Sequence, residues 1–182
     1  MTRSELARLM QNAGLLEEPV PAAAWRWIDT FMVAYGDVSS DPERAIAAVA
    51  SLRAEAVIVP ALELERLRSR EVVFFLDAVG QYVDAHEELR GLPVADDLPK
   101  IAEEFGLTRE DALTSVRMAL TAARSGPPLD LLFVLLGHDR ILMRIGAISS
   151  HLLHGRGLEP IKYGPGGEPF TPIRGVKPDH AD

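Results

Sequence analysis

The sequence contains no cysteine, which excludes disulfide bonds, thiolate metal sites and a cysteine nucleophile. It also has no apolar run of about 18 residues, the length that a membrane-spanning helix needs. Its N-terminal segment lacks the basic and then apolar order of a secretory signal. Because the absence of cysteine fits a reducing compartment, the sequence predicts a cytoplasmic protein with no membrane segment.

Recognisable catalytic patterns are missing as well. The sequence contains no phosphate-binding glycine loop, no dinucleotide fingerprint and no nucleophile triad. The acidic pairs Glu87-Glu88 and Asp96-Asp97 occupy adjacent positions, which diverge on a helix and do not form a general acid and base. His151 and His154 are one helical turn apart, but no neighbouring carboxylate completes a metal site, so an exposed helix end is favoured. The sequence predicts a protein that is not an enzyme and uses neither cofactor nor metal.

Positive charge is scarce and unevenly distributed. The chain carries 19 basic and 27 acidic residues, a net charge of -8, yet residues 106–156 alone hold six basic and four acidic residues. A protein of this charge is not expected to coat nucleic acid or to bind DNA, although a local RNA site is allowed. Sixteen of the basic residues are arginine, whose planar fork contacts phosphates and stacks on bases.

Apolar residues recur at helical spacing along most of the chain and strand patterns are nearly absent, which predicts an all-α fold. We expect Ser40 to cap a helix, Pro60 to interrupt the chain, and Trp25 to be buried while Trp27 is exposed. The break at Gly91-Leu92-Pro93 is the expected subdomain boundary. The expected helices cover residues 6–13 and 21–35, a stretch from the Ser40-Asp41-Pro42-Glu43 start signal to the low fifties, residues 98–105, 110–123 and 129–136, and a last helix from His138 or Asp139 to Leu152. A long core helix is expected from Ser69, and the expected domains are 1–92, 93–156 and a Gly/Pro-rich tail, 157–182.

The most informative stretch is SVRMALTAARSGPPLDLLFVLLGHDRILMRIGAI, residues 115–148. It reads as a helix with Arg117 and Thr121, a tight turn at Gly126-Pro127-Pro128, a short helix that ends at Gly137, and a helix with Arg144. A turn this restricted loses little conformational entropy when it binds a ligand, and its backbone groups stay open. It therefore fits a rigid binding ledge, while the simpler alternative is a chain reversal between two packed helices.

This stretch resembles the C-terminal anticodon-binding domain of bacterial-type glutamyl-tRNA synthetase. The resemblance rests on Arg117-Met-Ala-Leu-Thr121, Gly126-Pro-Pro-Leu129, Leu135-Leu-Gly137 and Arg144-Ile145. More loosely, Ala13-Gly14-Leu15, the tryptophan-bearing helix and Glu103-Glu-Phe-Gly-Leu107 occur in the expected order. The resemblance covers roughly residues 5–152 and implies a two-lobed helical bundle.

The resemblance also implies a function in translation. It points to tRNA, and to glutamate tRNA in particular, bound through its anticodon loop, and no catalytic half with His-Ile-Gly-His and Lys-Met-Ser-Lys-Ser motifs is present. We therefore expect a stand-alone tRNA-binding module whose protein partner is a catalytic synthetase or a related enzyme. The implied tRNA-binding residues are Arg117, Thr121, Arg124, Gly126, Pro127, Leu129 and Arg144. Of the arginines, Arg124, Arg140 and Arg144 either position the phosphate backbone or are structural, and Arg144 could equally be held by a neighbouring carboxylate.

Three departures from the family pattern favour an alternative. Ala122 replaces the glycine after Ala-Leu-Thr, His138 replaces a lysine, and Ala34-Tyr35-Gly36-Asp37 replaces an Arg-x-Lys-Thr segment. Each change removes positive charge or flexibility. The alternative is a degenerate paralogue that acts as a protein interaction module without RNA, through its acidic face or its tail.

Overall fold

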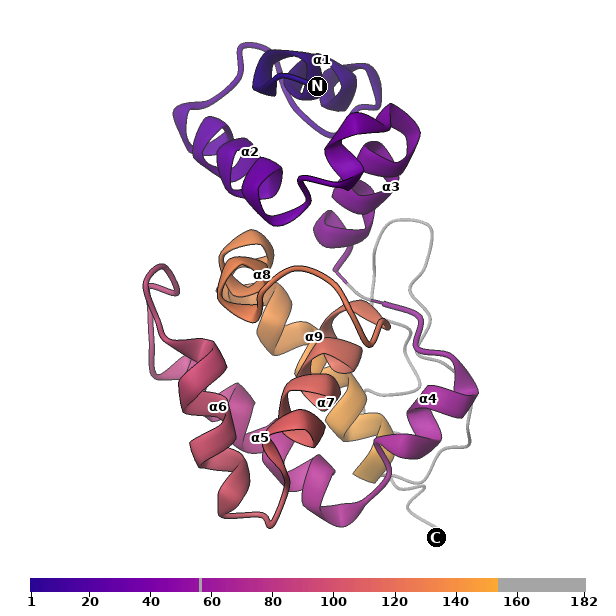
Figure 1. Ribbon diagram of the computed structural model, residues 1–182, viewed down its shortest axis with the longest axis vertical. Helices are drawn as coiled ribbons and strands as arrows, with labels where there is room; N and C mark the ends of the chain where they lie inside the picture. Colours follow the sequence, from indigo (N-terminus) through magenta and orange to yellow (C-terminus); the bar gives the residue numbers. More distant parts are fainter. Residues whose placement is uncertain (56, 154–182) are drawn as a thin grey trace, which may run out of the picture.

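The computed structural model describes residues 1–55 and 57–153, apart from the side chain of Ser39, and contains only helices within those ranges (Figure 1). The predicted all-α fold is confirmed. The predictions for residues 157–182 and for His154 lie outside the described residues.

The first three α-helices form one group, at the top of Figure 1. They are α1 (Arg3–Asn12), α2 (Ala22–Ala34) and α3 (Pro42–Arg53), with a short 3-10 helix at Val38–Ser40. Asp41, and not Ser40, caps α3, because its carboxylate accepts hydrogen bonds from the amides of Glu43 and Arg44. Ser40 instead ends the 3-10 helix.

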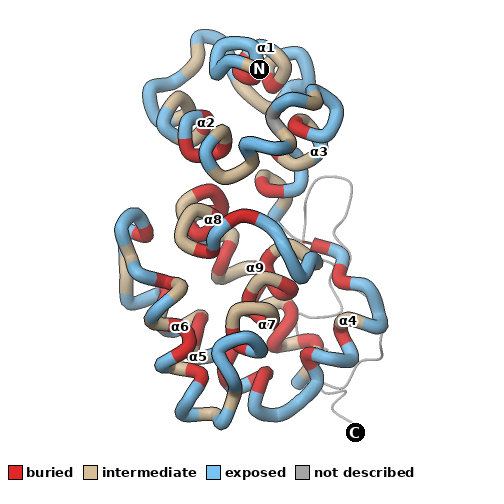
Figure 2. The backbone as a smooth tube through the Cα atoms, in the orientation of Figure 1, coloured by how far each residue is buried: buried red, intermediate tan, exposed pale blue. Residues whose placement is uncertain are grey.

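The remaining helices form a second group, which contains most of the buried chain in Figure 2. Ser69 and Thr108 cap α5 and α7 with their hydroxyl groups, as the N-cap pattern predicts. The helices are α4 (Ala61–Arg66), α5 (Arg70–Asp84), α6 (Val94–Glu103), α7 (Arg109–Thr121), α8 (Leu129–Leu136) and α9 (His138–Leu153).

The loop at Gly91-Leu92-Pro93, the expected subdomain boundary, joins α5 to α6. Helix α5 packs along α9 and also contacts α6 and α7, so the loop at Gly91-Leu92-Pro93 lies within the second group. The two groups are separated by the chain between Arg53 and Ala61, which contains Pro60. They meet where α2 and α3 contact α8. In the part of the chain that the structure describes, no helix is long and apolar enough to span a bilayer.

Candidate functional site

The turn between α7 and α8 is braced from within by Arg117. The Nη1 of Arg117 donates a hydrogen bond to the carbonyl oxygen of Pro127 at 2.5 Å, and the Thr121 hydroxyl donates to the carbonyl oxygen of Arg117 at 2.8 Å. Gly126 and Pro128 are exposed while Pro127 is buried. A Cβ atom on Gly126 would lie 3.4 Å from Arg117 Nη1, closer than most such contacts. The turn is therefore partly open, and Arg117 fixes its shape.

Arg144 is an interior residue, which favours its structural role over its contact with phosphate. Its side chain is 1% exposed. The guanidinium donates hydrogen bonds to Leu120 at the end of α7 and to Ser51, Leu52 and Ala54 at the end of α3, in each case to the carbonyl oxygen. The last carbonyls of a helix have no partner within the helix and carry partial negative charge. Arg144 therefore joins the ends of two helices from different groups.

The other predicted residues divide between surface and interior. Leu129 is 3% exposed and Pro127 is buried, so both support the turn and do not face solvent, contrary to their predicted contact with RNA. Arg124 is exposed, and its Nε and Nη2 donate to Glu63 Oε2 at 3.1 and 2.9 Å. The structure thus brings Arg117, Thr121 and Gly126 together at the turn and directs Arg124 towards α4.

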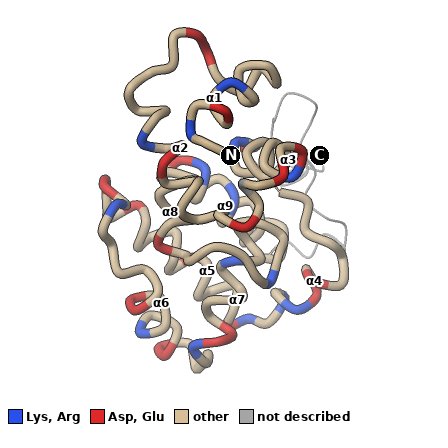
Figure 3. Tube along the Cα trace, turned by 45° about the horizontal axis from the view of Figure 1, so that its top comes forward, with Lys and Arg blue, Asp and Glu red and all other residues tan. Residues whose placement is uncertain are grey.

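Two further arginines lie beside Arg144, and we refer to Arg53, Arg117, Arg140 and Arg144 as the arginine group. Arg140 Nε donates to the carbonyl oxygen of Arg53 at 3.1 Å, and its Nη1 donates to that of Leu136 at 3.3 Å. Arg53 Nη1 donates to the carbonyl oxygen of Leu15. Among the described residues, no carboxylate oxygen lies within 4.0 Å of the guanidinium nitrogens of Arg53, Arg117 or Arg140. Figure 3 shows that basic and acidic residues alternate along the rest of the trace.

Comparison with known proteins connects this region to a family. The chain is 22% identical over 139 residues to glutamate–tRNA ligase 2 of Caldanaerobacter subterraneus subsp. tengcongensis, a match that covers 76% of this chain and 28% of that protein. Residues 61–148 match the sequence model of the family described as the anticodon binding domain. This segment is an anticodon-binding domain of the glutamyl-tRNA synthetase type. No solved structure matches the chain significantly.

The matched anticodon-binding domain runs from α4 to the middle of α9 and includes α7, the turn and α8. The first three helices precede it. Of the arginine group, Arg117, Arg140 and Arg144 belong to the domain, whereas Arg53 reaches it from α3. The arginine group therefore lies where the domain meets the preceding helices.

Tyr35 belongs to the segment, residues 34–37, that replaces the basic Arg-x-Lys-Thr segment of the resembled family. It lies beside the arginine group. Its ring stacks on Phe31 with centroids 4.8 Å apart and planes 15° from parallel. Burial raises the pKa of the Tyr35 phenol, and the positive charges of Arg117 and Arg144 act against that rise. Burial lowers the pKa of Arg117 and of Arg53, and for Arg53 the neighbouring Arg140 adds to the effect.

Trp27 is half-buried and not the exposed base-stacking residue that the sequence predicts. Its Nε1 donates to the carbonyl oxygen of Leu135 at 2.8 Å, its ring stacks on Phe31 at 5.5 Å, and the Arg53 guanidinium lies 5.5 Å from the ring centroid. Trp25 is also half-buried, and Arg3 lies 5.3 Å from its ring centroid. Helical periodicity identified which face Trp27 occupies but not that α8 covers that face.

The anticodon-binding domain provides no evident metal site in the described residues. Within residues 1–55 and 57–153, no three His, Asp or Glu side chains are grouped so that they could hold an ion. His151, on α9, is buried.

Ala122 ends α7 in the left-handed conformation, with φ 56° and ψ 19°, at the position where the family carries glycine. A side chain at this φ clashes with its own backbone, and glycine does not. We expect Ala122→Gly to raise the free energy of unfolding by about 1 kcal/mol, because relief of this strain outweighs the extra entropy of the unfolded chain. Urea denaturation followed by circular dichroism measures the change.

Ala123→Gly is the matched control. Ala123 is the next residue, is exposed and has no positive φ, so the substitution should give no stabilisation. Equal effects of the two substitutions would show that the left-handed conformation of Ala122 is not a source of strain.

Proposed function

We propose that the chain binds the anticodon loop of a tRNA, with glutamate tRNA as the first candidate, and does not itself activate an amino acid. The observation that carries the proposal is the partly exposed turn of the anticodon-binding domain, which is braced by Arg117, an arginine that like Arg53 and Arg140 has no carboxylate partner among the described residues. Proteins read RNA sequence mainly in single-stranded loops, where splayed bases contact arginine planes and open backbone groups.

Local electrostatics support RNA binding despite the overall charge of -8. The ends of α3, α7 and α8 converge on the arginine group, and each contributes about half a negative charge. These partial charges offset the guanidinium charges only in part, so a positive region remains. Because the acidic surface elsewhere repels phosphates, binding should be confined to this region and involve few phosphates.

The side chains at the turn have separate roles in this proposal. Arg117 is a positioning residue, since its hydrogen bond to Pro127 holds the turn, while its remaining N–H groups are directed to RNA. Gly126 and Pro128 present exposed backbone to the bases. Arg124 lies at the edge, where exchange of Glu63 for a phosphate costs little because an exposed ion pair is weak.

The proposed absence of catalysis rests on the part of the ligase that the chain matches. The chain spans 28% of the length of that relative, and the match is to an anticodon-binding domain. Purified protein incubated with ATP, glutamate and tRNA should give no glutamyl-tRNA. Measurable product would contradict this part of the proposal.

The proposal is tested by recovering RNA from total cellular RNA with the purified protein and sequencing it. The wild type should enrich one tRNA, and Arg117→Ala should weaken its affinity about tenfold, because both the shape of the turn and one contact are lost. The matched control is Arg109→Ala, on the same helix, where the arginine is exposed and paired with Asp96. Its affinity should stay within about twofold of the wild type.

Arg124→Ala separates binding from folding. Since Arg124 is exposed and Glu63 is its only hydrogen-bond partner among the described residues, the variant should be as stable as the wild type. If it contacts a phosphate, the slope of log affinity against log salt concentration should fall by about 0.7. Recovery of all RNAs equally, of none, or of the same tRNA by every variant would count against the proposal.

A further inference from the structure

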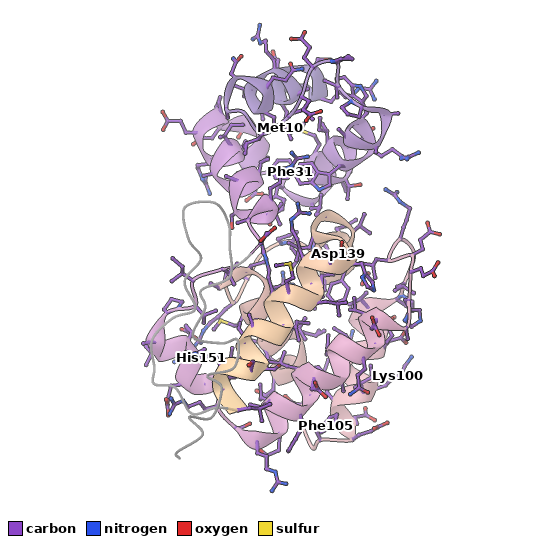
Figure 4. All side chains as sticks on the ribbon, turned by 180° about the vertical axis from the view of Figure 1, so that it is seen from behind. Met10, Phe31, Lys100, Phe105, Asp139 and His151 are labelled. Carbon is purple, nitrogen blue, oxygen red and sulfur yellow. The ribbon has the colours of Figure 1, made fainter. Side chains whose placement is uncertain are left out.

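A second surface of the molecule has the opposite charge to the arginine group. A groove of about 270 Å³ runs between α5 and α9, and we call it the α5–α9 groove. Viewed from behind in Figure 4, α9 and α5 lie in front, whereas α7 lies in front of α9 in Figure 1. The groove therefore lies on the face opposite α7. Its lining includes Asp77, Gly80, Asp84, Ile145, Gly146 and Ser149.

The floor of the groove is open to close approach by another backbone. Gly80 and Gly146 have no side chains, and a Cβ atom on Gly146 would meet nothing within 4 Å. A Cβ atom on Gly80 would lie 3.9 Å from the Ile145 side chain, which is ordinary contact. Glycines at these positions allow a third helix to pack closer to α5 and α9 than the usual 8 to 10 Å between helix axes.

Ser149 supplies independent evidence that the groove is incomplete. Ser149 is 6% exposed, and its hydroxyl group has no hydrogen-bond partner in the part of the chain that the structure describes. An unpaired buried hydroxyl costs about 1 to 3 kcal/mol, so such groups normally have a partner. Because Ser149 lines the groove, a polar group that enters the groove would satisfy it.

The charge of the lining selects the kind of partner. Asp77 and Asp84 are exposed, and within the described residues neither forms an ion pair, since Asp77 only accepts a hydrogen bond from Gln81 at 3.0 Å. None of the described residues that line the groove is basic. The two carboxylates would repel phosphates and attract cations. They are seven residues apart, which on a helix is two turns, or about 10.5 Å.

We propose that the α5–α9 groove binds a helix of a partner protein that carries two lysine or arginine residues two turns apart. The two cations pair with Asp77 and Asp84, the helix backbone passes over Gly80 and Gly146, and a polar group of the partner bonds to Ser149. RNA on the arginine group and a basic helix in this groove would occupy opposite faces and not compete. The inference does not depend on RNA binding.

Two synthetic alanine-rich helical peptides of identical composition test the proposal with the full-length protein. One carries lysines at positions i and i+7, on one face, and the other at i and i+5, on different faces. In ¹⁵N-labelled protein, the first peptide should shift the amide signals of Gly80, Gly146 and Ser149 to saturation. The second should bind about two- to fivefold more weakly, because only one of its lysines reaches a carboxylate.

Variants locate the binding site. Asp77→Asn with Asp84→Asn should weaken the i, i+7 peptide about five- to tenfold, whereas Glu103→Gln with Glu104→Gln removes the same charge from α6 and should leave affinity within twofold. Gly146→Leu should abolish binding while the protein stays folded, because Gly146 is exposed on a helix and its surroundings have space.

Three results would overturn the proposal. One is equal binding of the two peptides, or no shift of the three amide signals. Another is wild-type affinity in the Asp77/Asp84 or Gly146 variants. The third is a shift of the same amides, without peptide, when Lys162, Arg174 and Lys177 are replaced by alanine, since the occupant would then be this chain's own C-terminal segment.

Discussion

Replacement of Arg144 by methionine should lower the free energy of unfolding by about 3 to 5 kcal/mol, a large part of the stability of a domain of this size. The substitution keeps an unbranched apolar chain but removes the guanidinium that donates to Leu120, Ser51, Leu52 and Ala54. These carbonyl oxygens would then lie at two helix ends without their donor, and each unpaired buried group costs about 1 to 3 kcal/mol. Denaturation in urea, monitored by circular dichroism, measures the loss.

Two variants test whether stability depends on the planar guanidinium of Arg144, with its several N–H donors, or on its positive charge alone. Arg144→Lys keeps the charge but has a single nitrogen, which cannot reach the ends of α3 and α7 together, so it should recover less than half of the lost stability. Arg44→Met removes an exposed arginine from α3 and should change stability by less than about 0.5 kcal/mol. Wild-type stability in Arg144→Met would show that the two helix groups are not joined through this residue.

Local sequence signals predicted the helices well because most helix ends here are determined within a few residues. Ser69 and Thr108 cap their helices with their own hydroxyls, and Gly137 ends α8 at φ 75°. The predicted start of α6, at residue 98, was wrong, because the helix begins at Val94 with support from a residue that is distant in the sequence. The Asp130 carboxylate accepts a hydrogen bond from the Ala95 amide at 3.0 Å, so a residue of α8 supports the first turn of α6. Pro99, which would fall in the first turn of a helix that began at Leu98, lies inside α6.

The candidate site was predictable in its composition but not in its exposure. The motif identified Arg117, Gly126 and Arg144 together, yet only the hydrogen bonds between α9 and the end of α3 show that Arg144 is interior. Arg53 was not predicted as a site residue, since nothing in its local sequence indicates that α3 ends beside Arg140. The acidic groove was missed because Asp77 and Ser149 lie on helices that are distant in the sequence.

Replacement of Trp27 by alanine should lower the free energy of unfolding by about 3 to 5 kcal/mol, as expected for loss of a large packed aromatic side chain. Trp27 lies between the two helix groups, with its ring on Phe31 and near Arg53, and its Nε1 on the Leu135 carbonyl at the end of α8. The truncation removes the ring contacts and leaves that carbonyl without its donor. Thermal and urea denaturation measure the loss.

Trp27→Phe divides this effect into two parts. Phenylalanine retains the stacking on Phe31 but has no N–H group, so only the hydrogen bond to Leu135 is lost, and the cost should be about 1 to 2 kcal/mol. Trp27→Ala and Arg144→Met both act where the first three helices meet the anticodon-binding domain, so their effects should not add. If their effects were additive within about 0.5 kcal/mol, Trp27 and Arg144 would stabilise the junction independently, and the two helix groups would not be held by one connected set of helix-end contacts.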